Sequence, residues 1–236
     1  GYESLRIKLE QLDEIESGNL RVGVNPVIAH VYLSEVGARF LRDYPEVRIS
    51  TSVRDASGLI DLMREGELDL MIGFERLFSL QKDLEITRLF EAAVPWWVRK
   101  GHPLLRKRKM AMGDFADYPI ISQHLPPLYM ERFVDLCLSA ERDREVGSVS
   151  NAHLVDDYSV LCRMAVQSDA ILLCPELHAR AGSMADRLRR LEAPIEMPPA
   201  TISAAWPTHP TPSPLATRFL GILQEEIEAV LGETGG

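Results

Sequence analysis

Cysteine is scarce in this sequence, and the few cysteines are far apart. Only Cys137, Cys162 and Cys174 occur among 236 residues, and no two of them form a CxxC pair. Their number and spacing indicate neither a disulfide framework nor a zinc site. Each lies in an apolar segment, so we expect three buried free thiols, no bound metal and no cofactor.

Long apolar runs are also missing. No run approaches the ~18–20 residues that span a bilayer, and segment 1–16 is charged throughout, unlike a secretory signal peptide. We therefore expect a cytoplasmic protein without a membrane partner. Hydrophobic residues nevertheless make up 46% of the chain, enough for one large core or two modest ones.

Positive charge is outweighed by negative charge. The formal net charge is −9, whereas a protein that neutralises nucleic-acid phosphates needs a basic face. We expect this segment as a whole to repel DNA. One basic cluster stands out, formed by Arg99, Lys100, Arg106, Lys107, Arg108 and Lys109. Because it flanks a loop-like stretch, we expect a solvated surface loop in preference to a polyanion site.

Catalytic motifs are absent as well. The sequence contains no GxSxG, HExxH, P-loop or GxGxxG motif. Its histidines and serines are scattered without the spacing that would favour a catalytic triad. We therefore expect no enzyme, although an enzyme on the same scaffold stays open because a fold does not fix a function.

Short apolar strands and amphipathic helices alternate along the first third of the chain. Their connections are short, which predicts a parallel sheet covered on both faces. Ser57 is placed to cap the second helix. We expect these elements at 20–24 (strand), 30–44 (helix), 47–53 (strand), 58–65 (helix) and 68–73 (strand).

A second α/β block follows, and the chain then returns to a strand and a long amphipathic helix. We expect strands at 93–98, 118–122, 145–149, 169–174 and 202–206, and helices at 128–140, 153–167 and 215–231. A further helix at 2–16 carries leucine and isoleucine in steps of three and four, which favours pairing with another helix.

Several sequence segments, taken in their order along the chain, resemble the effector-binding domain of LysR-type transcriptional regulators. They are GNLRVGV, FLRDYPEVRIS, GELDLMIG, RKGHPL, MGDFADYPIIS and VLCRMAVQSDAILLCPE, and the resemblance runs from about Gly18 to Leu231. The chain departs from the family at Gln167–Ala170, where members often carry a glycine-rich turn, and at Ala92–Val98, which is bulkier than expected because it contains two tryptophans.

The resemblance implies an α/β fold of the periplasmic-binding-protein type, with two Rossmann-like lobes joined by a two-strand hinge. Lobe I would comprise 18–91 and 200–236, and lobe II 92–199. Segment 1–17 would be the end of a linker helix, and the family's N-terminal winged helix-turn-helix would lie outside this chain.

Ligands of open α/β sheets bind beyond the carboxyl ends of the strands, and pockets favour domain interfaces. We therefore expect a small effector, an organic anion, in a cleft between the lobes. The candidate ligand-binding residues follow the expected strands and are Asn25, Pro26, Val27, Ile28, Ser57, Phe74, Ser122, His124, Asn151 and His153.

The function that the resemblance implies is a small-molecule sensor. Effector binding would alter the geometry of a homodimer or homotetramer, in which helix 30–44 packs against the partner, and promoter DNA would be bound by the missing N-terminal domain. Two alternatives stay open at this point: a solute-binding protein of a transport system, and a cytoplasmic enzyme on the same scaffold.

Overall fold

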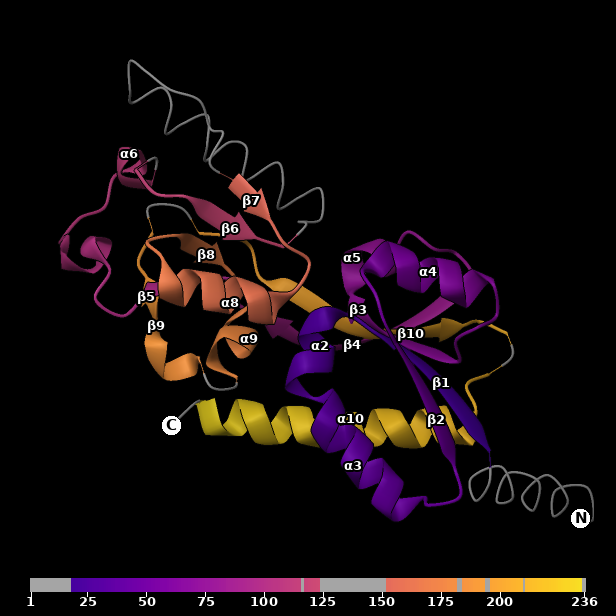
Figure 1. Cartoon of the computed structure of the whole chain (residues 1–236). Helices are drawn as coiled ribbons and strands as arrows, with labels where there is room; N and C mark the ends of the chain where they lie inside the picture. The colour runs from indigo at the N-terminus through magenta and orange to yellow at the C-terminus, as the bar shows by residue number, and fades with distance from the viewer. Residues whose placement is uncertain are drawn as a thin grey trace, which may run out of the picture. The chain divides into compact units, whose positions relative to one another are not determined.

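The computed structural model describes residues 18–115, 117–123, 152–181, 184–193, 196–209 and 211–234. The chain divides into two compact units, Gly1–Glu91 with Thr201–Gly236, and Ala92–Ala200. Within these described ranges, each unit contains one five-stranded sheet with helices (Figure 1). The predicted α/β class is confirmed.

The sheet of the first unit is mixed. β1 is parallel to β2 and to β3, as the alternation of strands and helices predicted, but β10 is antiparallel to β3. The sequence pattern missed β4 because its apolar residues do not stand out from their charged neighbours. In sheet order the strands are β2 (Arg48–Val53), β1 (Asn19–Val24), β3 (Leu70–Phe74), β10 (Ala200–Pro207) and β4 (Leu84–Ala92).

The helices of the first unit lie on both faces of this sheet. Figure 1 shows α4 and α5 on one face, and α2, α3 and α10 on the other. The single helix predicted at 30–44 is wrong in its start, because two helices meet at Tyr32. The bounds are α2 (Pro26–Val31), α3 (Leu33–Asp43), α4 (Ala56–Arg64), α5 (Glu75–Phe78) and α10 (Pro214–Thr234).

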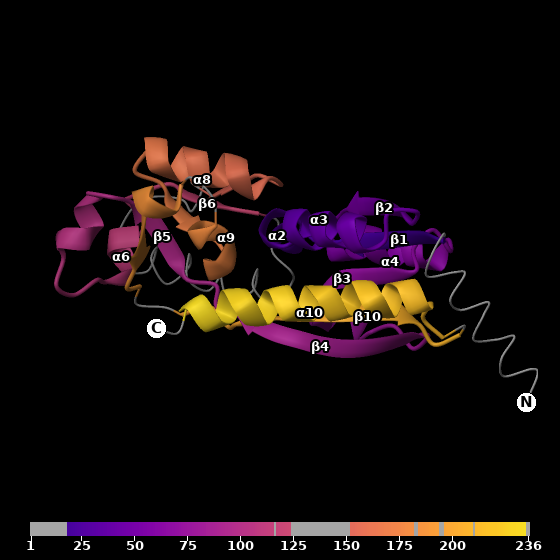
Figure 2. The ribbon, with the colours of Figure 1, turned by 90° about the horizontal axis from the view of Figure 1, so that it is seen from below.

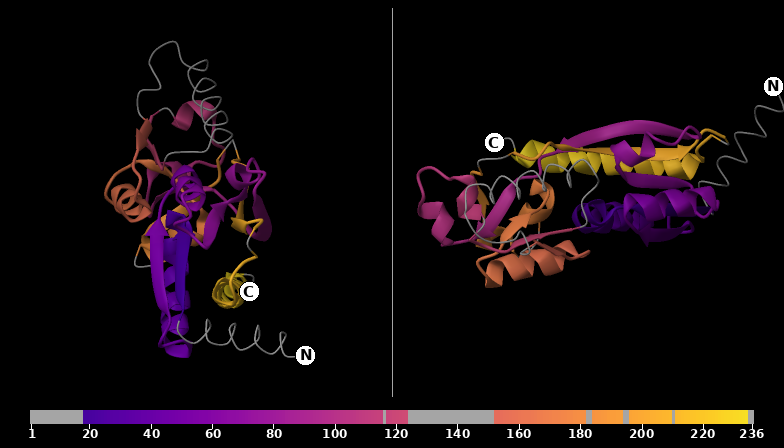
Figure 3. Two further views of the ribbon diagram at one scale, coloured as in Figure 1. Left: turned by 90° about the vertical axis from the view of Figure 1, so that its right-hand side faces the viewer. Right: turned by 90° about the horizontal axis from the view of Figure 1, so that it is seen from above.

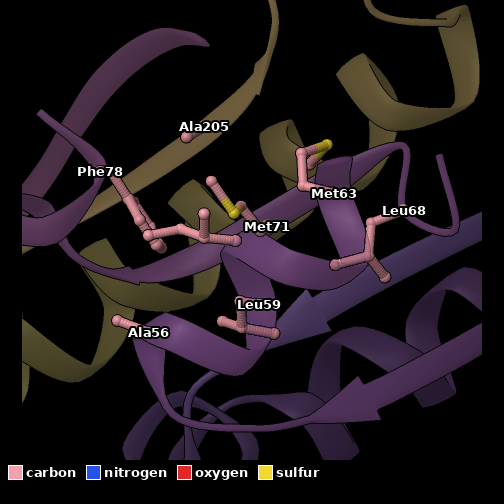
Figure 4. Close-up of a cluster of buried hydrophobic side chains, with 8 residues drawn as sticks. Ala56, Leu59, Met63, Leu68, Met71, Phe78 and Ala205 are labelled. Carbon is pink, nitrogen blue, oxygen red and sulfur yellow. The ribbon is translucent and has the colours of Figure 1, made fainter. Parts of the chain in front are cut away.

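Successive residues of β1 face opposite sides of the sheet, and helices pack against both sides. Val22 and Val24 are fully buried, and Gly23 between them allows α4 to come close to the strand. A Cβ added at Gly23 would lie 2.6 Å from methyl carbons of both Leu59 and Leu68. Figure 4 shows this side of the core, where α4 and α5 pack on β3 and β10.

On the opposite face, α3 packs against α10. The rings of Phe40 and Phe219 lie 5.8 Å apart, and Arg39 on α3 forms ion pairs with Glu225 and Glu226 on α10. Figure 2 shows α10 running beside α3, and the left panel of Figure 3 looks along α10. The C-terminal amphipathic helix predicted from the sequence is confirmed.

The second unit has a shorter-stranded sheet, with α8 over one face (Figure 2). In sheet order its strands are β7 (Ala152–Leu154), β6 (Ile120–Ser122), β8 (Ile171–Leu173), β5 (Trp96–Arg99) and β9 (Leu188–Leu191). Its helical segments are η1 (Pro103–Arg106), α6 (Met112–Phe115), α8 (Tyr158–Gln167), α9 (Glu176–Arg180) and η2 (Ala185–Arg187).

The start of the helix predicted at 153–167 is wrong. Residues 152–154 form β7, and α8 begins only after Asp157, whose side chain accepts a hydrogen bond from the Val160 amide at 2.9 Å. The predicted helix 128–140 and strand 145–149 lie outside the described residues. Among the residues described, no helix is long and apolar enough to cross a membrane.

Candidate functional site

Parallel pairing brings the ends of the first three strands to one edge of the first sheet. Val24 of β1 is in register with Val53 of β2 and with Ile72 of β3. The residues that follow these strands therefore lie along the same edge. This is the edge at which open α/β sheets bind their ligands.

Asn25 is the polar side chain that β1 delivers to this edge. It is only 1% exposed, and its amide oxygen accepts a hydrogen bond from the Ile28 backbone N–H at 2.9 Å. Its backbone N–H donates to the Ile72 carbonyl at 2.9 Å. The side-chain nitrogen Nδ2 is buried and has no hydrogen-bond partner among the described residues. A buried donor without an acceptor costs about 1–3 kcal/mol, so a ligand acceptor at this position would be favourable.

The other three candidates after β1 are placed differently. Pro26 opens α2, where its fixed φ suits the first helical turn. The side chains of Val27 and Ile28 are each 1% exposed and belong to the core. The Ile28 amide is already bonded to Asn25. Of the four candidates in this segment, Asn25 is the one with a side-chain polar group left to bind a ligand.

The predicted capping role of Ser57 is wrong. Asp55 is the N-cap of α4, and its Oδ1 accepts from the Gly58 amide at 2.9 Å. The Ser57 hydroxyl instead donates to Asp55 Oδ2 at 2.8 Å and is exposed. The helix begins two residues earlier than predicted, and a carboxylate is as good an N-cap as a serine hydroxyl. Contact between Ser57 and a ligand stays a prediction.

Phe74 ends β3, and the residue after it starts a polar cluster that the sequence did not reveal. Phe74 is half-buried and pairs with Ile202. Glu75 accepts a hydrogen bond from the Ser203 hydroxyl at 2.6 Å and pairs with Arg88 at 3.3 Å. The Arg88 guanidinium, then the Ser203 hydroxyl, hold the pKa of Glu75 below its usual range. No local pattern signals these contacts, because β4 and β10 supply the partners.

Tyr32 is a second buried polar group in the first unit. It is 1% exposed, and its ring lies edge-on to Phe90 with 6.1 Å between the centroids. Its hydroxyl has no hydrogen-bond partner among the described residues. Burial raises the pKa of Tyr32 to about 12, so it stays a neutral donor. Sequence reasoning placed Tyr32 inside a helix and did not single it out.

In the second unit, Ser122 and His153 lie on neighbouring parallel strands. Ser122 ends β6 and is 1% exposed, while its carbonyl accepts from the Val155 amide at 3.0 Å. His153 is the middle residue of β7, pairs with Ile121, and is exposed. The sequence placed His153 at the start of a helix, which is wrong. His124 and Asn151 lie outside the described residues.

The cysteines that the structure describes are buried free thiols, as predicted for Cys162 and Cys174. Interaction with the Cys174 thiol, then with His178, lowers the pKa of Cys162 to about 6, and burial raises the pKa of Cys174. Cys137 lies outside the described residues. Within the described ranges, no group of three or more His, Cys, Asp or Glu side chains is placed to hold a metal ion.

Solved structures with the same fold are regulator domains. The cofactor-binding domain of the Cbl transcriptional regulator has a TM-score of 0.70 and 21% identity, covering 90% of this chain and 92% of that one. The Synechocystis CcmR regulatory domain, solved in complex with 2-PG, has a TM-score of 0.68 and 17% identity, covering 88% and 96%. Identities this low establish the shared fold alone.

Curated relatives by sequence are transcriptional regulators. The SDS degradation transcriptional activation protein of Pseudomonas sp. is 26% identical over 177 residues, 74% of this chain and 55% of the relative. The HTH-type transcriptional regulator YtlI of Bacillus subtilis is 28% identical over 116 residues, 49% of this chain and 37% of the relative. The matched regions thus span about half of these relatives or less. The family model of the LysR substrate binding domain matches residues 13–228, and the chain therefore belongs to that family.

Proposed function

We propose that this chain is the small-molecule sensor of a LysR-type transcriptional regulator. The family membership, the two α/β units and the regulatory roles of the relatives support a sensor. They favour it over a transport-linked binding protein or an enzyme. The proposal includes a cytoplasmic location and promoter DNA bound by a winged helix-turn-helix domain outside this chain.

The buried side-chain nitrogen of Asn25, which has no hydrogen-bond partner among the described residues, is the main support for effector binding. This Nδ2 donor lies at the carboxyl edge of the first sheet. A carboxylate or phosphate oxygen of an organic anion would accept this hydrogen bond. Ser57 and Phe74 would border the ligand in the first unit, and Ser122, His124, Asn151 and His153 would contribute from the second. The inter-lobe cleft itself stays a prediction.

Effector binding would act by shifting the equilibrium between two arrangements of the protein. A ligand that binds one arrangement of the protein better than another moves the equilibrium by its differential affinity. A coupling of about 1–3 kcal/mol is enough for a useful switch. We propose that the shift alters the packing of a homodimer or homotetramer, and through it the spacing of the DNA-binding domains.

A thermal-shift screen of aromatic, aliphatic and phosphorylated carboxylic acids tests the proposal, followed by calorimetry on the best ligand. In Asn25→Ser the serine hydroxyl still caps α2, but the amide donor is removed. We expect at least ten-fold weaker binding from this variant. Asn19→Ser makes the same replacement at the exposed start of β1, the opposite end of that strand from Asn25, and serves as the control.

Two results would contradict the proposal. If no acid in the screen raises the melting temperature, an organic-anion effector is wrong. If an acid binds and Asn25→Ser binds it as tightly as the unmodified chain does, Asn25 is not the recognition residue. Catalytic turnover of a bound acid would favour the enzyme alternative instead.

A further inference from the structure

The segment Trp97–Met110 in the second unit contains six lysines and arginines and no carboxylate. It runs from β5 through η1 and on to the residues before α6. Such a concentration is unusual in a chain with a net charge of −9. The sequence alone favoured a solvated surface loop here, because the basic cluster flanks a loop-like stretch.

Strand pairing brings a second basic run against the first. β9 lies beside β5 (Figure 1). The two strands are antiparallel, with Arg190 in register with Trp97 and Leu188 with Arg99. The Lys100 amide also donates to the Arg187 carbonyl at 2.7 Å. Arg187, Arg189 and Arg190 thus join a cluster that lies about ninety residues earlier in the chain. The fold, and not the local sequence, assembles this positive surface.

Only part of this charge is neutralised within the described residues. Arg99 pairs with Asp169 at 2.6 Å, and Lys107 pairs with Asp114. Arg108, Lys109 and Arg190 are exposed. In the part of the chain that the structure describes, these three side chains form no ion pair. They retain the capacity to bind an anion from solution.

A cavity of about 440 Å³ lies where the two basic runs meet. Its basic lining is Lys107, Arg108, Lys109 and Arg190, and Glu192 contributes a carboxylate. Leu104, Leu105 and Met110 supply apolar surface between the charges. The volume falls within the range of about 300–1,000 Å³ that is typical of small-molecule pockets.

We propose that this cavity is a second ligand site, for a small polyvalent anion with a compact apolar part, such as a phosphorylated or polycarboxylic acid. Arg108, Lys109 and Arg190 are the binding cations. Guanidinium groups bind carboxylate and phosphate through two parallel hydrogen bonds, and lysine adds a mobile point charge. The apolar lining and the small size of the cavity favour a small anion over an extended nucleic-acid backbone.

The cavity lies beside β9, the last strand of the second sheet, and β8 and β5 separate β9 from β6. β5 is antiparallel to both β8 and β9, so the carboxyl end of β9, with Arg190, lies at the same end of the sheet as Ser122. The basic residues that follow β5 start from the opposite end of the sheet. The proposed anion site shares no residue with the candidate effector-binding residues, so the failure of one proposal leaves the other standing.

Titration calorimetry of the whole chain with pyrophosphate tests the proposal. We expect saturable one-site binding, weakened at least ten-fold in Arg108→Gln/Lys109→Gln and in Arg190→Gln, because removing a charge-assisted hydrogen bond changes the affinity by about that factor. Arg76→Gln/Lys82→Gln removes the same charge as the double variant, from exposed positions of the first unit. This control is expected to bind within two-fold of the unmodified chain.

Other outcomes overturn the proposal. Equal weakening in the test and control pairs would mean that pyrophosphate responds only to net charge. We expect no saturable binding when sulfate or chloride replaces pyrophosphate at equal ionic strength, whereas equal heats from all three anions would show diffuse screening. Binding of a DNA duplex through Arg108 and Lys109, without competition by pyrophosphate, would assign the surface to nucleic acid.

Discussion

The hydroxyl of Ser203 donates a hydrogen bond to Oε2 of Glu75 across 2.6 Å, although 128 residues separate them in the sequence. Ser203 lies on β10, is fully buried, and is in register with Gly73 of β3. Glu75 starts α5, immediately after β3. The bond therefore links β10 to α5. β10 is the strand by which the chain returns to the first unit, and α5 lies at the edge of the candidate site.

Replacing Ser203 by alanine is expected to destabilise the first unit. A hydrogen bond to a charged group is worth about 1.5–3 kcal/mol, and the partly exposed carboxylate recovers some of this from water. We expect Ser203→Ala to lower the free energy of unfolding by about 1 kcal/mol, measured by urea denaturation. Ser79→Ala, which removes an exposed hydroxyl bonded to the Arg76 carbonyl, is expected to cost less. A cost for Ser203→Ala no larger than that of the control would contradict the prediction.

We expect the ionisation of Glu75 to contribute to the pH dependence of the free energy of unfolding. Arg88 and Ser203 lower its pKa in the folded state, so the unfolded chain takes up the proton first as the pH falls. The stabilisation is present above the unfolded pKa of about 4.3 and is lost as the pH drops through the lower folded value. Between pH 6 and pH 3.5, Glu75→Gln should lose less unfolding free energy than the unmodified chain. Parallel losses in both proteins would show that Glu75 is not responsible, and Glu85→Gln on β4 serves as an exposed control.

The sequence predicted the strands and helices best where they were locally periodic. β1, β2 and the buried β3 were recognisable from their apolar and β-branched residues, and Pro214–Thr234 from its helical stripe. β4 and β9 were missed because both are rich in charged residues and depend on the neighbouring strand. Side-chain periodicity contains no information about such a neighbour.

The candidate site was predictable only where a strand end identifies it. Asn25 was found because polar residues after β1 fall at the ligand edge of any such sheet. Arg88 and Ser203 were not, because they approach Glu75 from β4 and β10 only in the folded state. Arg190 lies beside the basic cluster because β9 pairs with β5, and no local motif predicts this pairing.

The N-cap of α4 offers a direct comparison of two candidates. Asp55 accepts from the Gly58 amide, whereas Ser57 only bonds to Asp55. Loss of an N-cap costs about 0.5–2 kcal/mol, so we expect Asp55→Ala to lower the free energy of unfolding by about 1 kcal/mol. Ser57→Ala is expected to cost less than half as much. Equal losses in urea denaturation, or a larger loss from Ser57→Ala, would restore the serine as the cap.

Gly23 and Gly221 are expected to respond to alanine in opposite directions. A Cβ at Gly23 meets buried methyl groups of Leu59 and Leu68 at 2.6 Å, so these two side chains must repack, at a cost of about 1–3 kcal/mol. A Cβ at Gly221, inside α10, meets nothing within 4 Å. There alanine should stabilise the helix by about 0.5–1 kcal/mol. Thermal unfolding followed by circular dichroism distinguishes the two, and a melting temperature raised by Gly23→Ala would refute the close approach.

Trp97 connects the second sheet to the segment that follows β8. Its indole N–H donates to the Cys174 carbonyl at 3.0 Å, and the side chain is 4% exposed. Trp97→Phe removes the donor, leaves a buried carbonyl without its partner, and opens a cavity the size of the missing ring. Together these cost about 2–4 kcal/mol. Trp206→Phe, on the half-buried end of β10, is the matched control and should cost less. Since both variants change tryptophan fluorescence, unfolding is best followed by circular dichroism, and a Trp97→Phe chain as stable as its control would show that the indole bond contributes nothing.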